Sequence, residues 1–199
     1  MEVKSRRIIM ENQPSKYQKK ILTIPNLLSL LRIFMIPPLV WLYCIKEDYF
    51  ATLVLLTLSG ITDVADGIIA RRFNMISDFG KAFDPVADKL TQAVMLFCLT
   101  ARFELMLLPL LLLVVKETIA AITGILSIKK SGKVMGALWH GKAATVMLYI
   151  IMAMHIIWFD LPLTVSYVSI LACSAMMIFS AILYSIRNIK VIVSYVCKG

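Results

Sequence analysis

The chain has 199 residues, of which 60% are hydrophobic, and its mean hydropathy is +0.83. A soluble globular domain is only about 45–50% apolar, so this composition excludes one and predicts an integral membrane protein. The formal net charge is +9. Because the basic residues lie between the apolar stretches, they favour anionic lipid over nucleic acid as the partner.

Residues 1–22 are predicted to form a basic juxtamembrane segment ahead of a membrane domain at 23–199. Six lysines and arginines lie in this segment against Glu2 and Glu11, and a short interfacial helix fits residues 15–22. The first 20 residues lack the apolar run of a signal peptide, so we expect the first apolar stretch to act as the insertion signal.

Six apolar stretches follow, and each is long enough for a helix that crosses the bilayer. Crossing about 30 Å of hydrocarbon takes roughly 20 residues of α-helix. The pattern therefore predicts an all-α integral membrane protein with six transmembrane helices. The stretches lie at residues 27–45, 50–70, 83–101, 104–128, 143–159 and 162–186.

The basic residues between these stretches predict the topology. One side of the membrane receives the N-terminal segment and nearly all other lysines and arginines, whereas the opposite side receives only Lys46 and Arg102. By the positive-inside rule, both termini are then cytoplasmic. The even number of helices agrees with this orientation.

Two aspartates at the end of the second stretch share one face of a helix. Asp63, Asp66, Gly67, Ala70 and Arg71 follow the spacing i, i+3, i+4, i+7, i+8. This spacing produces one stripe at 3.6 residues per turn. The stripe is expected at the cytoplasmic end of the helix.

Two further aspartates begin the third stretch. Asp84 and Asp88 are four residues apart and share a helix face. We expect Asp84 to cap this helix and Pro85 to lie in its first turn. The loop at 73–83 is short enough to hold the two helices antiparallel, so the four carboxylates are predicted to converge.

Carboxylates at a membrane border need a counter-charge, an ion or water, because each costs several kcal/mol near hydrocarbon, roughly 2.5–3.5 kcal/mol for Asp at a helix centre. Oxygen ligands without His or Cys favour Mg²⁺, Mn²⁺ or Ca²⁺ over zinc or copper, and two ions would neutralise four acids. Gly67 and Arg71 suit the approach and binding of a diphosphate. Two alternatives are a divalent-cation transporter and a buried acid–base network with Arg71, Arg72, Lys81 and Lys89.

The acidic segment resembles the signature of the CDP-alcohol phosphatidyltransferase family, D-x-x-D-G-x-x-A-R-x8-G-x-x-x-D-x-x-x-D. The eight fixed positions are matched by Asp63, Asp66, Gly67, Ala70, Arg71, Gly80, Asp84 and Asp88. The segment TIPNLLSLLRIFMIPP at 23–38 is similar to the start of phosphatidylglycerophosphate synthases. Chance agreement over so many positions is very improbable.

The resemblance implies transfer of the phosphatidyl group of CDP-diacylglycerol to a small polar alcohol, with release of CMP. It implies that Asp63, Asp66 and Asp84 hold the two metals with help from Asp88, and that Asp88 is the general base. It also implies a homodimer and, together with the lack of a transit peptide, a bacterial plasma membrane, in which the positive-inside rule predicts a site facing the cytoplasm. The residues implied for CDP-diacylglycerol binding are Pro25, Asn26, Ser29, Asp63, Gly67, Ala70, Arg71, Ser77 and Gly80.

The acceptor implied by the likeness to phosphatidylglycerophosphate synthases is sn-glycerol 3-phosphate, which needs a basic pocket for its phosphate. Lys116 stands where those enzymes tend to have arginine, and Ala144 stands where they tend to have a second lysine. Lys116 could equally pair with Glu117, and we assign no role to His140. Cardiolipin synthase and an inositol-phosphate acceptor are the alternatives within the family. The candidate residues for the acceptor phosphate are Arg72, Lys81, Lys116, Lys133 and Lys142.

Overall fold

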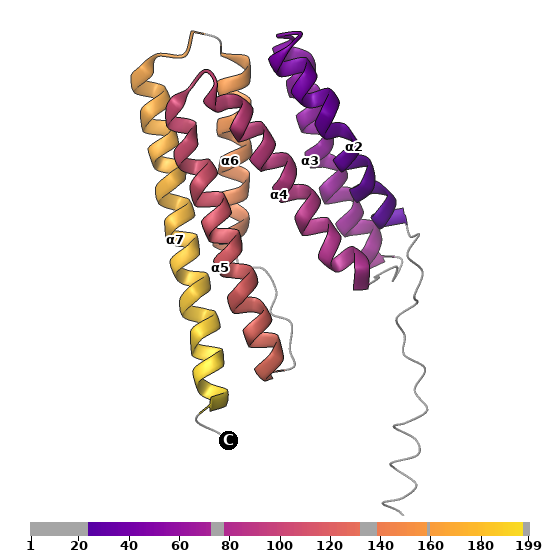
Figure 1. Ribbon diagram of the computed structural model, residues 1–199, viewed down its shortest axis with the longest axis vertical. Coiled ribbons are helices and arrows are strands. Elements are labelled where there is room, and N and C mark those ends of the chain that lie inside the picture. Colours follow the sequence, from indigo (N-terminus) through magenta and orange to yellow (C-terminus); the bar gives the residue numbers. More distant parts are fainter. Residues whose placement is uncertain (1–23, 73–77, 132–138, 159, 197–199) are drawn as a thin grey trace, which may run out of the picture. The chain divides into compact units, whose positions relative to one another are not determined.

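The computed structural model describes residues 24–72, 78–131, 139–158 and 160–196, and each regular element in these ranges is a helix (Figure 1). The prediction of an all-α protein is confirmed. Six long helices follow the predicted apolar stretches. They are α2 (Ile24–Cys44), α3 (Tyr49–Arg72), α4 (Asp78–Thr100), α5 (Leu107–Ser131), α6 (Trp139–Ile157) and α7 (Leu163–Val196), with a 3-10 turn, η1 (Glu104–Met106), before α5.

Four segments in the described ranges are long and apolar enough to cross a membrane. α3 has a shorter apolar part, Tyr49–Ala65, because its second half carries the charged signature residues. The arrangement of six membrane spans therefore remains a prediction. The four segments are Leu27–Cys44, Glu104–Gly124, Trp139–Ile157 and Leu163–Lys190.

The predicted start of the third helix is wrong. α4 begins at Asp78 rather than near residue 83, so Pro85 lies inside the helix and not in its first turn, and Asp84 is not its cap. The prediction was based on hydropathy, and residues 78–82 are largely polar or small. Such residues can still continue a helix, because a helix needs only backbone hydrogen bonds. α7 likewise runs to Val196, beyond the predicted end at 186.

The connection between α2 and α3 explains why the two segments do not form one continuous helix. Glu47 has a φ of 52°, a left-handed conformation that a right-handed helix cannot contain. Asp48 then caps α3, since its Oδ1 accepts a hydrogen bond from the backbone N–H of Ala51 at 2.9 Å. The predicted tight turns at 102–104 and 160–162 are also found, between α4 and η1 and before α7.

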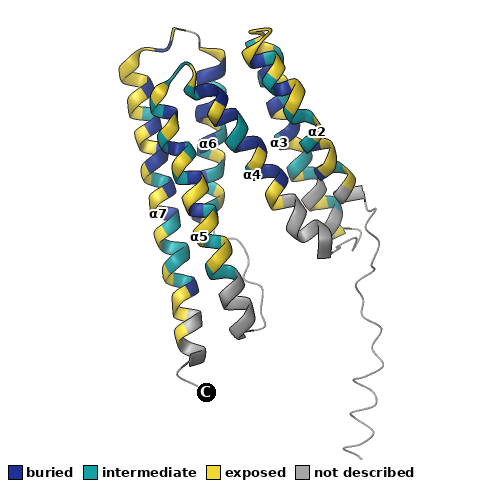
Figure 2. Ribbon diagram, in the orientation of Figure 1, coloured by how far each residue is buried: buried dark blue, intermediate teal, exposed yellow. Residues whose placement is uncertain are grey.

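The chain divides into two compact units. The first contains residues up to Ile36 together with Leu56–Thr91, and the second contains Pro37–Leu55 and all residues from Gln92 onward. The first unit has an unusually polar interior for so apolar a chain, and Figure 2 shows the buried positions along its helices. Its buried residues in the described ranges are Ser29, Arg32, Leu56, Ser59, Ala87, Asp88 and Thr91.

The second unit has a mainly apolar interior, in which α7 packs against both α5 and α6. Polar groups also join these helices. Asn188 of α7 donates to Thr123 Oγ1 of α5 at 2.7 Å. His155 of α6 lies 3.0 Å from Ser166 of α7 and 2.8 Å from the carbonyl oxygen of Ile151. Since a carbonyl only accepts, Nδ1 of His155 donates to it, and Nε2 accepts from the serine hydroxyl.

Large apolar side chains cover the outside of the helices, as the exposed positions in Figure 2 indicate. Phe34 and Phe97 are each 67% exposed, and Trp139 is 70% exposed. A water-soluble monomer does not leave so much apolar surface uncovered. The exterior therefore suits lipid, in agreement with the predicted integral membrane protein.

Candidate functional site

The signature lies on two helices of the first unit. Its first five positions, from Asp63 to Arg71, lie in the second half of α3, and its last three, from Gly80 to Asp88, lie in the first half of α4. The sequence pattern predicts a loop at Gly80, which is helical instead. The side chains of Asp66, Gly67, Ala70, Arg71, Gly80 and Asp84 lie outside the part of the structure that is described.

Asp63 is the first signature residue whose side chain is described, and it forms an ion pair. Its Oδ1 lies 2.9 Å from Nη1 of Arg32, on α2. The side chain of Arg32 is fully buried, whereas that of Asp63 is 40% exposed. Sequence reasoning did not assign Arg32 a role. The signal was available, because it is the single charged residue in α2, and a lone charge within an apolar span indicates a site.

Asp88 is the second signature acid whose side chain is described, and it is only 8% exposed. Its Oδ2 lies 3.3 Å from Nζ of Lys89, the next residue in the chain. A carboxylate that is nearly buried keeps a cation beside it because desolvation of an isolated charge is costly. The predicted catalytic acid thus lies in the protein interior rather than on the lipid face.

Two buried serines lie about one helical turn before Arg32 and Asp63 along the chain. Ser29, a predicted ligand-binding residue, and Ser59, one helical turn before Asp63, are both fully buried. Within the described residues, Oγ of Ser59 is buried without a hydrogen-bond partner. Pro25 and Asn26 lie in α2, but their side chains are not described, and Ser77 lies outside the described residues.

These donors fit a divalent metal by their chemistry. The first unit contains no His or Cys in its sequence, so carboxylate, hydroxyl and carbonyl oxygens are its available ligands, as Mg²⁺ and Mn²⁺ prefer. Among the described side chains, no three of the types His, Cys, Asp and Glu form a group that could hold a metal. Two of the four signature acids are not among those side chains.

The residues predicted to bind the acceptor phosphate are divided between the two units. Arg72 is exposed at the end of α3, and Lys81 lies in α4 with its side chain not described. In the second unit, Lys116 of α5 is 9% exposed, and its Nζ lies 2.9 Å from Oε1 of Glu117. This is the ion pair weighed as the alternative to a substrate role. Lys142 is exposed on α6, and Lys133 lies outside the described residues.

His140 is buried, at 3% exposure, although the sequence suggested no role for it. Its Nδ1 lies 3.1 Å from Oγ of Ser180 on α7, and its ring packs edge-on against Tyr184, with centroids 5.0 Å apart. The guanidinium of Arg187 in turn lies 5.0 Å from the ring centroid of Tyr184. This histidine cluster (His140, Ser180, Tyr184 and Arg187) joins α6 to α7, a contact between helices that local spacing does not predict.

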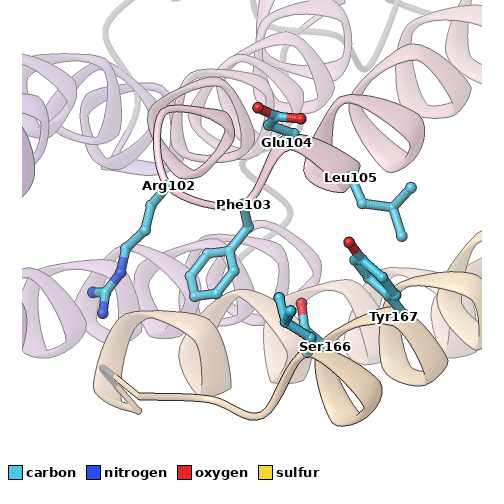
Figure 3. A pocket seen from close by; sticks show the side chains of 7 residues that line it. Arg102, Phe103, Glu104, Leu105, Ser166 and Tyr167 are labelled. Atoms are coloured by element: carbon cyan, nitrogen blue, oxygen red, sulfur yellow. The ribbon is translucent and has the colours of Figure 1, made fainter.

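A cavity of about 210 Å³ lies in the second unit, at the turn after α4 (Figure 3). The side chains of Arg102 and Glu104 point in different directions around it, so they do not form a joint charged site. No signature residue lines this cavity, and we exclude it from the candidate site. Its lining residues are Arg102, Phe103, Glu104, Leu105, Leu163, Ser166 and Tyr167.

Comparison with known protein families identifies the group to which this arrangement belongs. The sequence model of CDP-alcohol phosphatidyltransferases matches residues 22–183, which include the complete signature and helices α2 to α6. The chain belongs to the CDP-alcohol phosphatidyltransferase family.

Several curated members of this family are similar to the chain. A CDP-diacylglycerol–glycerol-3-phosphate 3-phosphatidyltransferase of Rickettsia typhi is 38% identical over 96 residues, 47% of this chain and 54% of that protein. Its counterpart from Aquifex aeolicus is 35% identical over 111 residues, 55% and 62% of the two chains. A cardiolipin synthase of Streptomyces coelicolor is 41% identical over 125 residues, 59% and 58% of the two chains. The chain thus spans between about half and two thirds of the length of these phosphatidyltransferases.

Proposed function

We propose that this protein transfers the phosphatidyl group of CDP-diacylglycerol to sn-glycerol 3-phosphate, giving phosphatidylglycerophosphate and CMP. The observation that carries the proposal is the complete signature within one compact unit, in which Asp88 is buried and the partly exposed Asp63 pairs with the buried Arg32. The similarity to the transferases of Rickettsia typhi and Aquifex aeolicus supports this acceptor.

The reaction is a displacement at the phosphorus atom that carries the diacylglycerol. The acceptor hydroxyl oxygen forms a new bond to that phosphorus, the bond from phosphorus to the bridging oxygen breaks, and CMP leaves with the bridging oxygen. Asp88, as general base, accepts the hydroxyl proton. The burial of Asp88 supports this role, because a buried side chain has few orientations and a base that is already oriented reacts more readily.

Asp63, Asp66, Asp84 and Asp88 would hold two Mg²⁺ or Mn²⁺ ions. When bound, these ions supply positive charge that offsets the negative charge growing on the diphosphate. Gly67 lets the nucleotide approach α3 closely, and Arg71 binds phosphate oxygens with its two-nitrogen fork.

The chain has six transmembrane helices, cytoplasmic termini and a cytoplasmic site in a bacterial plasma membrane, and it acts as a homodimer. The distribution of lysine and arginine supports this topology. The apolar exterior of the helices supports lateral entry of the diacyl substrate from the bilayer.

Cardiolipin synthesis is the second candidate, with phosphatidylglycerol as the acceptor. Two observations favour it: the similarity to the Streptomyces coelicolor cardiolipin synthase over 125 residues, and Ala144 at a position where a second phosphate-binding lysine was expected. Both reactions would use the same donor and the same aspartates.

A panel of acceptors distinguishes the candidates. Purified full-length protein is incubated with CDP-diacylglycerol, Mg²⁺ and one of three acceptors: sn-glycerol 3-phosphate, phosphatidylglycerol or inositol phosphate. We expect CMP and phosphatidylglycerophosphate with the first alone, identified by mass spectrometry of the lipids. Cardiolipin from phosphatidylglycerol would instead identify a cardiolipin synthase. Absence of CMP with every acceptor would contradict a transferase and favour cation transport.

A further inference from the structure

Arg32 is placed where a cation is costly. It is the single charged residue of α2, its side chain has no exposed surface, and its Nη1 lies 2.9 Å from Oδ1 of Asp63 on α3. The two residues are far apart in the sequence. Their contact therefore joins the segment similar to phosphatidylglycerophosphate synthases, at 23–38, to the first acid of the signature.

The two partners depend on this pair to different degrees. Asp63 is 40% exposed, so water can solvate its carboxylate without help from arginine. The fully buried guanidinium of Arg32 has no contact with water, so it needs an anion beside it. Packing alone does not explain the choice of arginine, since apolar residues of similar volume often replace buried ion pairs without loss of stability. A role in which Arg32 acts on Asp63 explains it.

The contact occupies one oxygen of Asp63. A charge-assisted bond between a guanidinium and a carboxylate is directional, so this contact restricts the orientation of the Asp63 side chain.

We propose that Arg32 is a positioning residue of the metal site: through its contact with Oδ1 it holds Asp63 in the orientation in which the carboxylate binds a divalent cation. This inference rests on the proposed function, which assigns Asp63 as a metal ligand. Arg32 touches neither the substrate nor the reacting atoms in this scheme. It acts through the carboxylate that it holds.

The test measures metal binding rather than turnover. Full-length protein in detergent is titrated with Mn²⁺, free Mn²⁺ is followed by electron paramagnetic resonance, and thermal unfolding is followed by tryptophan fluorescence with and without Mn²⁺. In Arg32→Met we expect the Mn²⁺ concentration for half-saturation to rise at least tenfold. In Arg32→Lys, which keeps the charge but loses the planar fork, we expect a smaller rise of about threefold.

Arg102→Met is the matched control, because it makes the same change in the second unit, where Arg102 stacks on Tyr49 and Phe103. Its Mn²⁺ midpoint should equal that of the unaltered protein. If Arg32→Met lowers the unfolding temperature but leaves the Mn²⁺ midpoint unchanged, Arg32 only joins two helices and the proposal is wrong. If Arg32→Met does not fold, an unchanged midpoint in Arg32→Lys likewise shows that the proposal is wrong.

The unaltered protein separates this proposal from the function on which it rests. If it binds no Mn²⁺ at all, the assignment of the metal site is wrong, and the role of Arg32 is excluded with it. If it binds Mn²⁺ and the Arg32 variants bind it equally well, only the role of Arg32 is excluded.

Discussion

At the scale of single residues, Asp88 permits the sharpest test of the chemistry. Asp88→Asn keeps the volume of this buried side chain but removes its capacity to accept a proton. We expect CMP release to fall by about 10²–10⁴-fold, the usual contribution of a general base, while CDP-diacylglycerol binding is retained. The measurements are CMP release and the shift of the unfolding temperature by CDP-diacylglycerol.

Asp160→Asn is the control for this prediction, because it makes the same change at an exposed acid in the turn before α7. It should leave CMP release unchanged. Release at the normal rate from Asp88→Asn would contradict the assignment of Asp88 as the base. Loss of both release and binding would instead indicate a ligand role only.

The sequence indicates candidate site residues where they form a motif within one segment of the chain. Asp88 and Ser29 are buried, and the roles assigned to them stay predictions. Arg32 and His140 were not assigned, because their partners, Asp63 and Ser180, lie on other helices. Local spacing contains no information about such contacts, which depend on how the helices pack.

At the scale of one element, replacement of glycine by alanine should affect stability differently at two helical positions. A Cβ atom at Gly141 of α6 would lie 2.7 Å from the Tyr184 hydroxyl and 2.8 Å from its Cε2, whereas one at Gly124 of α5 meets nothing within 4 Å. The ring of Tyr184 packs against His140 and Arg187, which limits its capacity to move aside.

We therefore expect Gly141→Ala to destabilise the protein, by about 1–3 kcal/mol of overpacking, offset by up to about 1 kcal/mol of improved helix propensity. Gly124→Ala should be neutral or stabilising, because only the propensity changes. Thermal unfolding of both variants in one detergent measures the difference. A stabilised Gly141→Ala variant would mean that α6 and α7 pack less closely than described.

The helices themselves were predicted well, since long apolar stretches have few other stable forms in a bilayer. Their ends were predicted less well. α4 begins at Asp78 and α7 continues to Val196, because polar residues continue a helix beyond its apolar part. Pro85 was consequently assigned to the first turn of α4, although it lies within the helix.

At the scale of the whole molecule, the predicted topology can be tested by labelling. Lys46 and Lys142 are both exposed, and the positive-inside rule assigns them to opposite sides of the membrane. In a background without native cysteines, Lys46→Cys should react with a membrane-impermeant maleimide on intact cells. Lys142→Cys should react only after lysis. Reaction of both on intact cells would contradict cytoplasmic placement of the site.

The membrane class followed from composition alone, because 60% hydrophobic residues cannot be covered in a chain of this size. The polar interior of the first unit did not follow from it. Burial of its serines, arginine and aspartate costs desolvation free energy, and this cost supports our proposal that they belong to a site.

The burial of Arg32 has a consequence for the biogenesis of this protein. α2 is synthesised before α3, and a single arginine opposes the insertion of such a segment, by up to roughly 2.5–3.5 kcal/mol if it lies at the helix centre. Its compensating carboxylate belongs to α3 and is synthesised later. We therefore expect α2 to become more favourable in the bilayer once α3 arrives, so that the Arg32–Asp63 pair couples the insertion of these two helices.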